Sequence, residues 1–264
     1  MTLPPHECRS LPARHLGRQL LVFPQLDSTN TLALSLATDP SHHGLVLLAK
    51  EQTAGRGQYG RSWHAPAGSS VLMSVLIFPP PELCRPAMLV AWAAVSVCEL
   101  IGELTGLPAT IKWPNDVLAH GKKVCGILTE QRNSGDRDRP LATVVGLGLN
   151  VSQPGETFAE AGLPDAGSLW SLSGRRFETD EVACRLIGRL DADYDRLLHG
   201  DAAAIESLWK QRLGLCGTNV RLVTASQVIH GRLMVVAFDG VDVQLDDGAI
   251  VRLAPESVRN IHTA

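Results

Sequence analysis

Cysteine is scarce and scattered in this sequence. The six cysteines among 264 residues form no C-x-x-C pair. Several lie in apolar contexts, where a thiol packs as a small hydrophobic group. The chain also has no segment with the length and composition of a secretory signal. These absences favour a reducing compartment, and we expect a cytoplasmic location.

Long apolar runs and strong net charge are also missing. The longest apolar stretch, residues 87–98, contains Ser96 and ends before Glu99, which makes it too short to span a membrane. The net charge of −3 gives no electrostatic reason to expect nucleic-acid binding. The nine histidines show no metal-ligand spacing, because the adjacent His42 and His43 cannot share a helix face. We expect no membrane span, no nucleic-acid partner and no metal site made of protein side chains.

The order of apolar patterns predicts an α+β fold with two domains. Residues 1–19 resemble a loose leader, 20–213 a mixed-sheet domain, and 214–264 a small β-barrel. Strands are expected at 20–23, 45–50, 71–77, 111–113, 123–129 and 142–150. Helices are expected after a cap at Ser28 or Thr29, over 86–105, and in two segments between 182 and 213, the second capped by Asp201. Residues 132–140 read as a solvated turn, and Asp247-Gly248 as a hairpin turn.

The loop at residues 49–63 is the most informative segment. It follows the apolar run 45–48 and contains three glycines, two arginines and a tryptophan. Glycines allow the backbone to approach a ligand closely, and arginines provide forked donors for carboxylate or phosphate groups. Tryptophan offers a flat face for a ring. Such a loop suits a small anionic molecule that carries a planar group.

The glycines Gly55, Gly57 and Gly60 match G-x-G-x-x-G, but the dinucleotide-binding interpretation fails. That fingerprint requires a helix to begin at the third glycine, so that the helix N-terminus holds the pyrophosphate. Here Pro66 and Gly68 follow, and the chain then becomes extended again. The protein-kinase version fails as well, because no V-A-I-K or H-R-D segment follows. The loop therefore joins one strand to another.

Four further segments carry functional side chains. They place hydroxyl and amide groups at a helix start, a cation and a carboxylate around a proline bend, a lysine at the start of a strand, and small residues at the end of a buried strand. In order, they are Asp27-Ser28-Thr29-Asn30, Lys112-Trp113-Pro114-Asn115-Asp116, Lys123 with Gly126, and Gly146-x-Gly148-x-Asn150.

Taken together, these motifs resemble those of biotin protein ligases. The matching pieces are D-S-T-N, E-Q-T-A-G-R-G-x-x-G-R-x-W, K-W-P-N-D, G-K-K-x-x-G-I-L-x-E and G-L-G-L-N, which lie in that order within residues 27–150. Each motif alone is weak, but five in order are highly specific. The resemblance implies a mixed-sheet catalytic domain of the biotin/lipoate ligase type, followed by a small SH3-like β-barrel.

The resemblance also implies a two-step reaction. Biotin and ATP form biotinyl-5′-AMP and pyrophosphate, with Mg²⁺ bridging the ATP phosphates. A lysine of a biotin carboxyl carrier protein then takes the biotinyl group. By this resemblance the catalytic residues are Lys123, Arg56 and Asp116. The implied biotin-binding residues are Ser28, Thr29, Asn30, Gln52, Arg56, Gly57, Gln58, Lys123 and Gly126. The implied ATP-binding residues are Arg56, Trp63 stacking on adenine, Asn115, Lys123 and Asn150.

Several departures and simpler interpretations accompany this hypothesis. Many relatives carry Arg where this chain has Gln58, which implies weaker retention of the adenylate. The ending G-E-(V/I)-S-x-R of some relatives is missing, so no ATP contact is assigned to the C-terminal domain. Arg61 is as consistent with a surface charge as with a ligand contact, Lys122 is expected to be solvated, and Trp113 to pack in the core.

Three other functions remain as alternatives. Lipoate ligases carry an R-R-x-S-G-G-G-x-V-F-H-D loop, whereas this chain has G-R-G-Q-Y-G-R-S-W. A DNA-binding, biotin-responsive repressor needs a winged helix, and about 19 residues before the first strand are too few for one. We therefore expect the monofunctional type of ligase. A non-catalytic biotin-binding module is disfavoured by Lys123 and the K-W-P-N-D motif. Both a monomer and a homodimer are compatible with the sequence.

Overall fold

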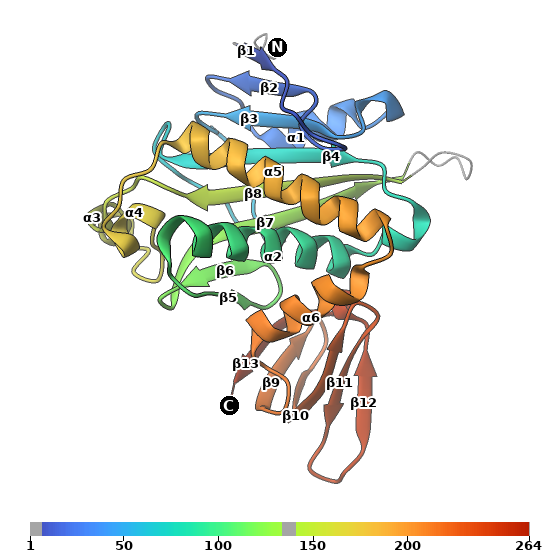
Figure 1. The fold of residues 1–264 in the computed structure, drawn as a ribbon. Helices are drawn as coiled ribbons and strands as arrows, with labels where there is room; N and C mark the ends of the chain where they lie inside the picture. The colour runs from blue at the N-terminus through green and yellow to red at the C-terminus, as the bar shows by residue number, and fades with distance from the viewer. Residues whose placement is uncertain (1–6, 134–140, 264) are drawn as a thin grey trace.

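An eight-stranded mixed sheet forms the centre of the first domain (Figure 1). The computed structural model describes residues 7–133 and 141–263. The spatial order of the strands is β1-β2-β3-β4-β8-β7-β6-β5, and only β2 and β3 pair in parallel. The strands are β1 (Glu7–Arg9), β2 (Leu20–Phe23), β3 (Leu45–Ala49), β4 (Ser70–Ile77), β5 (Ala109–Lys112), β6 (Asp116–Ala119), β7 (Lys122–Arg132) and β8 (Ala142–Asn150).

Helices cover the two faces of this sheet unequally. The long helices α2 (Pro86–Thr105) and α5 (Thr179–Leu198) lie on one face, which carries the larger core, and α1 (Thr29–Leu36) lies on the other (Figure 1). Helix α2 ends at Gly106, whose positive φ of 76° is the left-handed conformation expected at a helix C-terminus. The short α3 (Gly155–Glu160) and α4 (Leu169–Ser173) follow β8 and have no counterpart in the sequence prediction.

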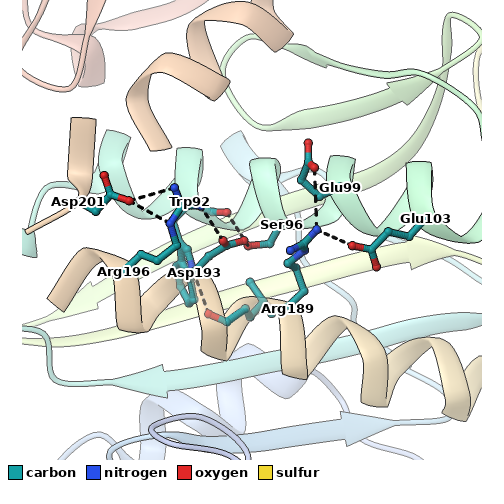
Figure 2. A network of polar contacts seen from close by, with 9 residues as sticks. Trp92, Ser96, Glu99, Glu103, Arg189, Asp193, Arg196 and Asp201 are labelled. Atoms are coloured by element: carbon teal, nitrogen blue, oxygen red, sulfur yellow. Dashed lines mark hydrogen bonds and ion pairs between the residues drawn. The ribbon is translucent and has the colours of Figure 1, made fainter. Parts of the chain in front are cut away.

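Polar contacts join α2 to α5 above the apolar core (Figure 2). The indole of Trp92 donates to the carbonyl of Leu190 at 3.1 Å, and Ser96 donates to Asp193 at 2.8 Å. Near the other end of the pair, Arg189 forms an ion pair with Glu103. Because the Trp92, Ser96 and Asp193 side chains are buried, these hydrogen bonds fix how the two helices pack.

The C-terminal domain is a five-stranded antiparallel sheet with the order β12-β11-β10-β9-β13. Its strands are β9 (Asn219–Thr224), β10 (Val228–Ala237), β11 (Gly240–Gln244), β12 (Ile250–Leu253) and β13 (Val258–Thr263). Helix α6 (Ala202–Leu213) leads into it and packs between the two sheets (Figure 1). The Trp209 ring of α6 lies 5.7 Å from that of Trp113 and 5.6 Å from that of Phe238, so the two domains share one hydrophobic core.

The α+β fold class with a small C-terminal β domain is confirmed, and the Asp247-Gly248 turn joins β11 to β12 as predicted. The leader prediction is wrong for residues 7–19. Strand β1 pairs with β2, and the buried carboxylate of Asp191 accepts hydrogen bonds from the backbone N–H groups of Arg14, His15 and Leu16 at 2.7–2.8 Å. This segment is therefore tied to α5.

The structure bears on two further local predictions, the cap at Asp201 and the turn at 132–140. Asp201 occupies the N-cap position of α6, but its side chain makes no capping hydrogen bond and instead pairs with Arg196 at 3.0 Å. The expected turn at 132–140 lies mostly outside the described residues.

Helix α2 is longer than the apolar run seen in the sequence. Its 20 residues would suit a membrane span by length and composition, but most of the helix is buried within the protein, as in a core helix. Two cysteines are buried in the same core. Burial raises the pKa of the Cys98 thiol to about 12 and that of Cys125 further above its ordinary range. Both thiols therefore stay protonated near neutral pH and act as packing groups.

Candidate active site: a cationic cleft on the sheet

The glycine–arginine loop forms a small hairpin at one side of the sheet. The backbone N–H of Gly57 donates to the carbonyl of Arg61 at 2.7 Å, and that of Trp63 donates to Gly55 at 3.0 Å. A single 3-10 turn at Gln58–Gly60 forms its tip, where Tyr59 takes a positive φ of 56° and has 60% of its surface exposed. No helix follows the third glycine, and the chain continues into β4, as predicted.

Two paired glycines form the floor of a cleft beneath this loop. Gly126 of β7 lies opposite Gly148 of β8, and the indole of Trp63 lies against both. A Cβ atom on Gly148 would lie 2.5 Å from Trp63 Cε2, and one on Gly126 would lie 2.9 Å from Trp63 Cζ3. The indole N–H is buried and has no hydrogen-bond partner among the described residues. Only glycine at these positions leaves room for the ring.

The cations of the cleft are held by carboxylates on neighbouring strands. Lys123 Nζ lies 2.6 Å from Asp116 Oδ1 and 5.6 Å from the centre of a Trp63 ring. Arg56 Nη2 lies 2.8 Å from Glu130 Oε1. Because β6 and β7 are paired, Asp116 is brought next to the lysine that lies seven residues later in the chain. The positions of the two cationic groups are thus fixed by carboxylates of the sheet, although both cations stand at the ends of long, flexible side chains.

An amide and hydroxyl cluster forms the other end of the cleft, at the start of α1. The Gln52 carbonyl oxygen accepts hydrogen bonds from the backbone N–H of Thr29 at 2.7 Å and from its hydroxyl at 3.1 Å. Ser74 lies within hydrogen-bond distance of Thr29 Oγ1 and Asn30 Oδ1, at 2.7 and 2.6 Å. Ser28 caps the helix, as predicted. These groups form a fixed set of donors and acceptors suited to a neutral polar ring.

Together these parts line one open cleft. Its charge is strongly one-sided. Among the described residues, five cationic side chains and a single carboxylate, Asp116, line it. The cations are Arg56, Arg61, Lys112, Lys123 and Arg259. A cleft of this kind concentrates anions, because its low-dielectric walls focus the electric field of the cationic side chains that line it.

The cleft brings together twelve of the thirteen residues that the sequence suggested. Those that line it are Ser28, Thr29, Asn30, Gln52, Arg56, Gly57, Gln58, Trp63, Asn115, Asp116, Lys123 and Gly126. Asn150 is the exception. It is buried at the end of β8, outside the lining, where its amide nitrogen donates to Gly167 O at 3.0 Å and its oxygen accepts from Ser70 and Gln153. Its placement indicates a structural role and does not favour ATP binding.

Several ambiguous residues are also placed by the structure. Arg61 lines the cleft, and Lys122 does not, because its amine donates to the carbonyl of Pro164 at 2.6 Å. Trp113 is buried as predicted, with its indole N–H donating to Val258 O at 2.8 Å. Asn115 is held against β7, where its side chain donates to the Ile127 carbonyl.

The sequence missed some lining residues. Lys112 stands in a quoted motif, but its role was not assigned. Tyr59 was given no role, although its neighbour Gln58 was predicted to bind biotin. Arg259 and Asn260 come from β13 of the C-terminal domain, for which no ATP contact was assigned. No local signal marks them, because they reach the cleft only through the docking of one domain on the other and through an irregularity in the pairing of β13 with β9.

The described residues that line the cleft include no cysteine, and the described chain forms no metal cage. The Cys125 thiol faces the core between Lys123 and Gly126 and is completely buried. Within residues 7–133 and 141–263, no group of three His, Cys, Asp or Glu side chains is arranged to hold a metal ion. The residues that line the cleft support anion binding by the cations, hydrogen bonding by the amide and hydroxyl groups, and proton transfer through Asp116.

Comparisons with known proteins agree with this fold. Residues 22–150 match the model of the biotin/lipoate A/B protein ligase family. A Bacillus subtilis protein named bifunctional ligase/repressor BirA is 33% identical over 250 residues, which are 94% of this chain and 74% of that protein. A Paracoccus denitrificans biotin–[acetyl-CoA-carboxylase] ligase is 34% identical over 235 residues, covering 87% of this chain and 92% of the relative.

A solved structure extends the likeness to the whole fold. The biotin protein ligase from Aquifex aeolicus in complex with biotin and ATP superimposes with a TM-score of 0.75 and 26% identity, covering 93% of this chain and 99% of the other. The fold and the cleft define a ligase domain with a small SH3-like β domain attached. The chain belongs to the biotin/lipoate A/B protein ligase family.

Proposed function

We propose that this chain is a biotin protein ligase, which activates biotin with ATP to biotinyl-5′-AMP and transfers biotin to a lysine of a biotin carboxyl carrier protein. The charge of the cleft is the observation that carries the proposal. Biotin presents a carboxylate and ATP a triphosphate, and these anions must meet in one place. Five cations against one carboxylate in the lining supply the fixed positive charge that this encounter requires.

In the first step, a carboxylate oxygen of biotin attacks the α-phosphorus of ATP. The bond from that phosphorus to the bridging oxygen breaks, and pyrophosphate leaves. Lys123 and Arg56 stabilise the negative charge that develops around phosphorus, because both are held beside the glycine floor by carboxylates on adjoining strands. Asn115, fixed to β7, and Trp63, lying across the floor, provide the polar contact and the flat surface for the nucleotide.

In the second step, the amine of the acceptor lysine attacks the carbonyl carbon of the adenylate, and AMP leaves. The attacking amine must lose a proton. Asp116 is the sole carboxylate among the described lining residues, which supports a role for it as the acceptor of that proton. Its ion pair with Lys123 at 2.6 Å also orients the lysine while the adenylate is held.

The uncharged end of biotin fits the amide and hydroxyl cluster at α1. The ureido ring has both donors and acceptors, and Gln52, Thr29 and Ser28 offer both kinds of group at one place. The valerate chain then lies along the loop backbone at Gly57 and Gln58, beside the indole of Trp63 that covers the glycine floor.

Mg²⁺ is expected to enter with ATP. The described residues form no carboxylate cage, which fits an ion held mainly by the substrate phosphates, as is usual for Mg²⁺ at nucleotide sites. When bound, it neutralises phosphate charge. A cytoplasmic location and the absence of nucleic-acid binding remain predictions from the sequence, which is compatible with both a monomer and a homodimer.

Biotin-dependent exchange between ATP and labelled pyrophosphate tests the first step, because it requires adenylate formation but no carrier. The expected result is exchange with biotin, none without it, and none with lipoate in its place. Transfer is then measured on a biotin carboxyl carrier domain, with the acceptor lysine changed to arginine as the control. Exchange that depends on lipoate would reassign the chain to the other branch of its family, and no exchange with either acid would refute the activity.

A further inference from the structure

Glu130 lies next to the cleft but outside its lining. Side chains alternate along a strand, so Glu130 of β7 shares a face with Gly126 and Leu128, both of which line the cleft. The Glu130 side chain is 21% exposed. A partly buried carboxylate beside an anion-binding cleft opposes the charge that the cleft collects, so its presence requires a reason.

Its two carboxylate oxygens bind two lining residues from different elements. Glu130 Oε1 accepts from Arg56 Nη2 at 2.8 Å, and Oε2 accepts from Asn30 Nδ2 at 2.9 Å. Asn30 is itself buried and fixed, because its oxygen contacts the Ser74 hydroxyl at 2.6 Å and lies where a Cβ on Gly146 would be only 2.1 Å away. Glu130 therefore connects the loop arginine to a rigid part of the sheet.

Arg56 depends on this contact for its position. Its side chain is 46% exposed, and among the described residues it has no other hydrogen-bond or ion-pair partner. A guanidinium carries five N–H donors, and Glu130 occupies one of its nitrogens. The remaining donors stay available to an anion in the cleft.

We propose that Glu130 is a positioning residue, which holds Arg56 so that the free edge of its guanidinium meets the anionic part of the ligand. This inference rests on the proposed function of the cleft. Fixing a long side chain before binding removes part of the entropy that binding would otherwise cost. Glu130 therefore favours adenylate formation although it shares the sign of the substrates.

The opposite role makes the opposite prediction. If Glu130 merely competed with the ligand for Arg56, removing its charge would release the arginine and strengthen binding of the anions. The sign of the effect of Glu130→Gln thus separates positioning from competition. The glutamine keeps nearly the same shape, and its single carbonyl oxygen can satisfy Asn30 or Arg56 but no longer attracts the guanidinium as an ion.

The experiment is a double-mutant cycle between Glu130→Gln and Arg56→Ala. Its two readouts are the rate of pyrophosphate exchange and the biotin affinity measured by calorimetry. We expect Glu130→Gln alone to lower kcat/KM for exchange about tenfold, within the range of coupling between contacting residues. In the Arg56→Ala background the same change should alter exchange less than about twofold, since the residue on which it acts is gone. Glu130→Asp should recover part of the loss.

Glu103→Gln is the matched control, because it removes a glutamate from the ion pairs with Arg185 and Arg189 on the far helices. It should leave exchange unchanged. Tighter binding in Glu130→Gln, or an equal loss with and without Arg56, would overturn the positioning role. Because wild-type exchange is measured in the same series, an inactive wild type would refute the proposed function instead, and active wild type with an additive cycle would refute only the role of Glu130.

Discussion

Lys123 and Lys122 are adjacent lysines with different surroundings. Lys123 lies in the cleft beside Asp116, and its charge acts mainly as negative charge develops at phosphorus. Lys123→Ala should therefore lower the rate of adenylate formation by about 10²–10³, the usual loss for one positioned donor, while most biotin affinity remains. Pyrophosphate exchange measures the first effect and calorimetry the second.

Lys122→Ala is the control for that change. Its amine reaches the Pro164 carbonyl outside the cleft, so exchange and thermal stability should stay near those of the wild type. An inactive Lys122→Ala beside a fully active Lys123→Ala would show that the site has been assigned to the wrong lysine.

Gly148 supports a second prediction at this scale. A methyl group there would lie 2.5 Å from the Trp63 ring, too close for the present packing. Gly148→Ala should therefore destabilise the protein by about 1–3 kcal/mol, the usual effect of overpacking. In a Trp63→Ala background the cost should fall to a small fraction of this, as measured by urea unfolding. An unchanged cost would locate the strain in the backbone of β8 instead of the indole.

At the residue scale the sequence identified the cleft well where function and local chemistry coincide. The loop arginine and Lys123 were found because their residue types stand in a fixed order of motifs. Asn150 was assigned by motif too, yet its amide is used by Gly167 and Gln153. Arg259 was missed because only tertiary docking brings it to the cleft. The motifs therefore predicted which residues gather at the cleft, but not which partner each side chain binds.

At the scale of elements, the loop 53–64 joins two rigid strands but is itself weakly held. It keeps a few internal backbone hydrogen bonds, yet most of its side chains are exposed, and such segments open at low free-energy cost. Trypsin should cut the free protein after Arg56 or Arg61, and biotin with ATP should suppress the cleavage by engaging both arginines. Sites in β9–β13 should be cut equally in both states.

Equal cleavage of the loop with and without ligands would mean that the arginines are not recruited. ATP alone and biotin alone provide the remaining arms. Protection that requires both ligands indicates that the adenylate orders the loop, and protection by either one indicates that a single anion suffices.

Elements with strong periodicity were predictable, and short ones were not. The helical pattern over 86–105 and the glycine at 106 marked α2 with its correct ends, because helix length and the left-handed cap are local properties. Strand β6 and the helices α3 and α4 were not predicted, because elements of four to six residues are too short to show a clear hydrophobic periodicity. Residues 7–19 were predicted to be a loose leader because the residue that anchors them, Asp191, lies some 175 residues away in sequence and leaves no local signal.

At the scale of the whole molecule, the two domains are continuous in their packing. A single hydrophobic cluster includes Trp113 of the first domain, Trp209 of α6 and Val241 of the second. The Trp113 indole donates to the backbone of β13, so the strand that carries Arg259 is fixed against the cleft wall. The sequence predicted a domain boundary after residue 213, where helical patterns give way to short strands, but it could not show that the two domains share a core.

Trp209 tests this continuity, because its buried ring lies between Trp113 and Phe238. The wild type should unfold in one transition, and Trp209→Ala should lose about 3–5 kcal/mol of unfolding free energy, as expected for a large side chain removed from a core. The control is Trp170→Ala, whose half-buried ring on α4 lies under Arg176 and should cost far less. Urea unfolding followed by circular dichroism measures the loss, and hydrogen exchange in β9–β13 reports whether the small domain opens first.

Two separate transitions in the wild type would contradict a shared core. A single transition that splits in Trp209→Ala would show that this one ring joins the domains, and that Arg259 keeps its place at the cleft through it.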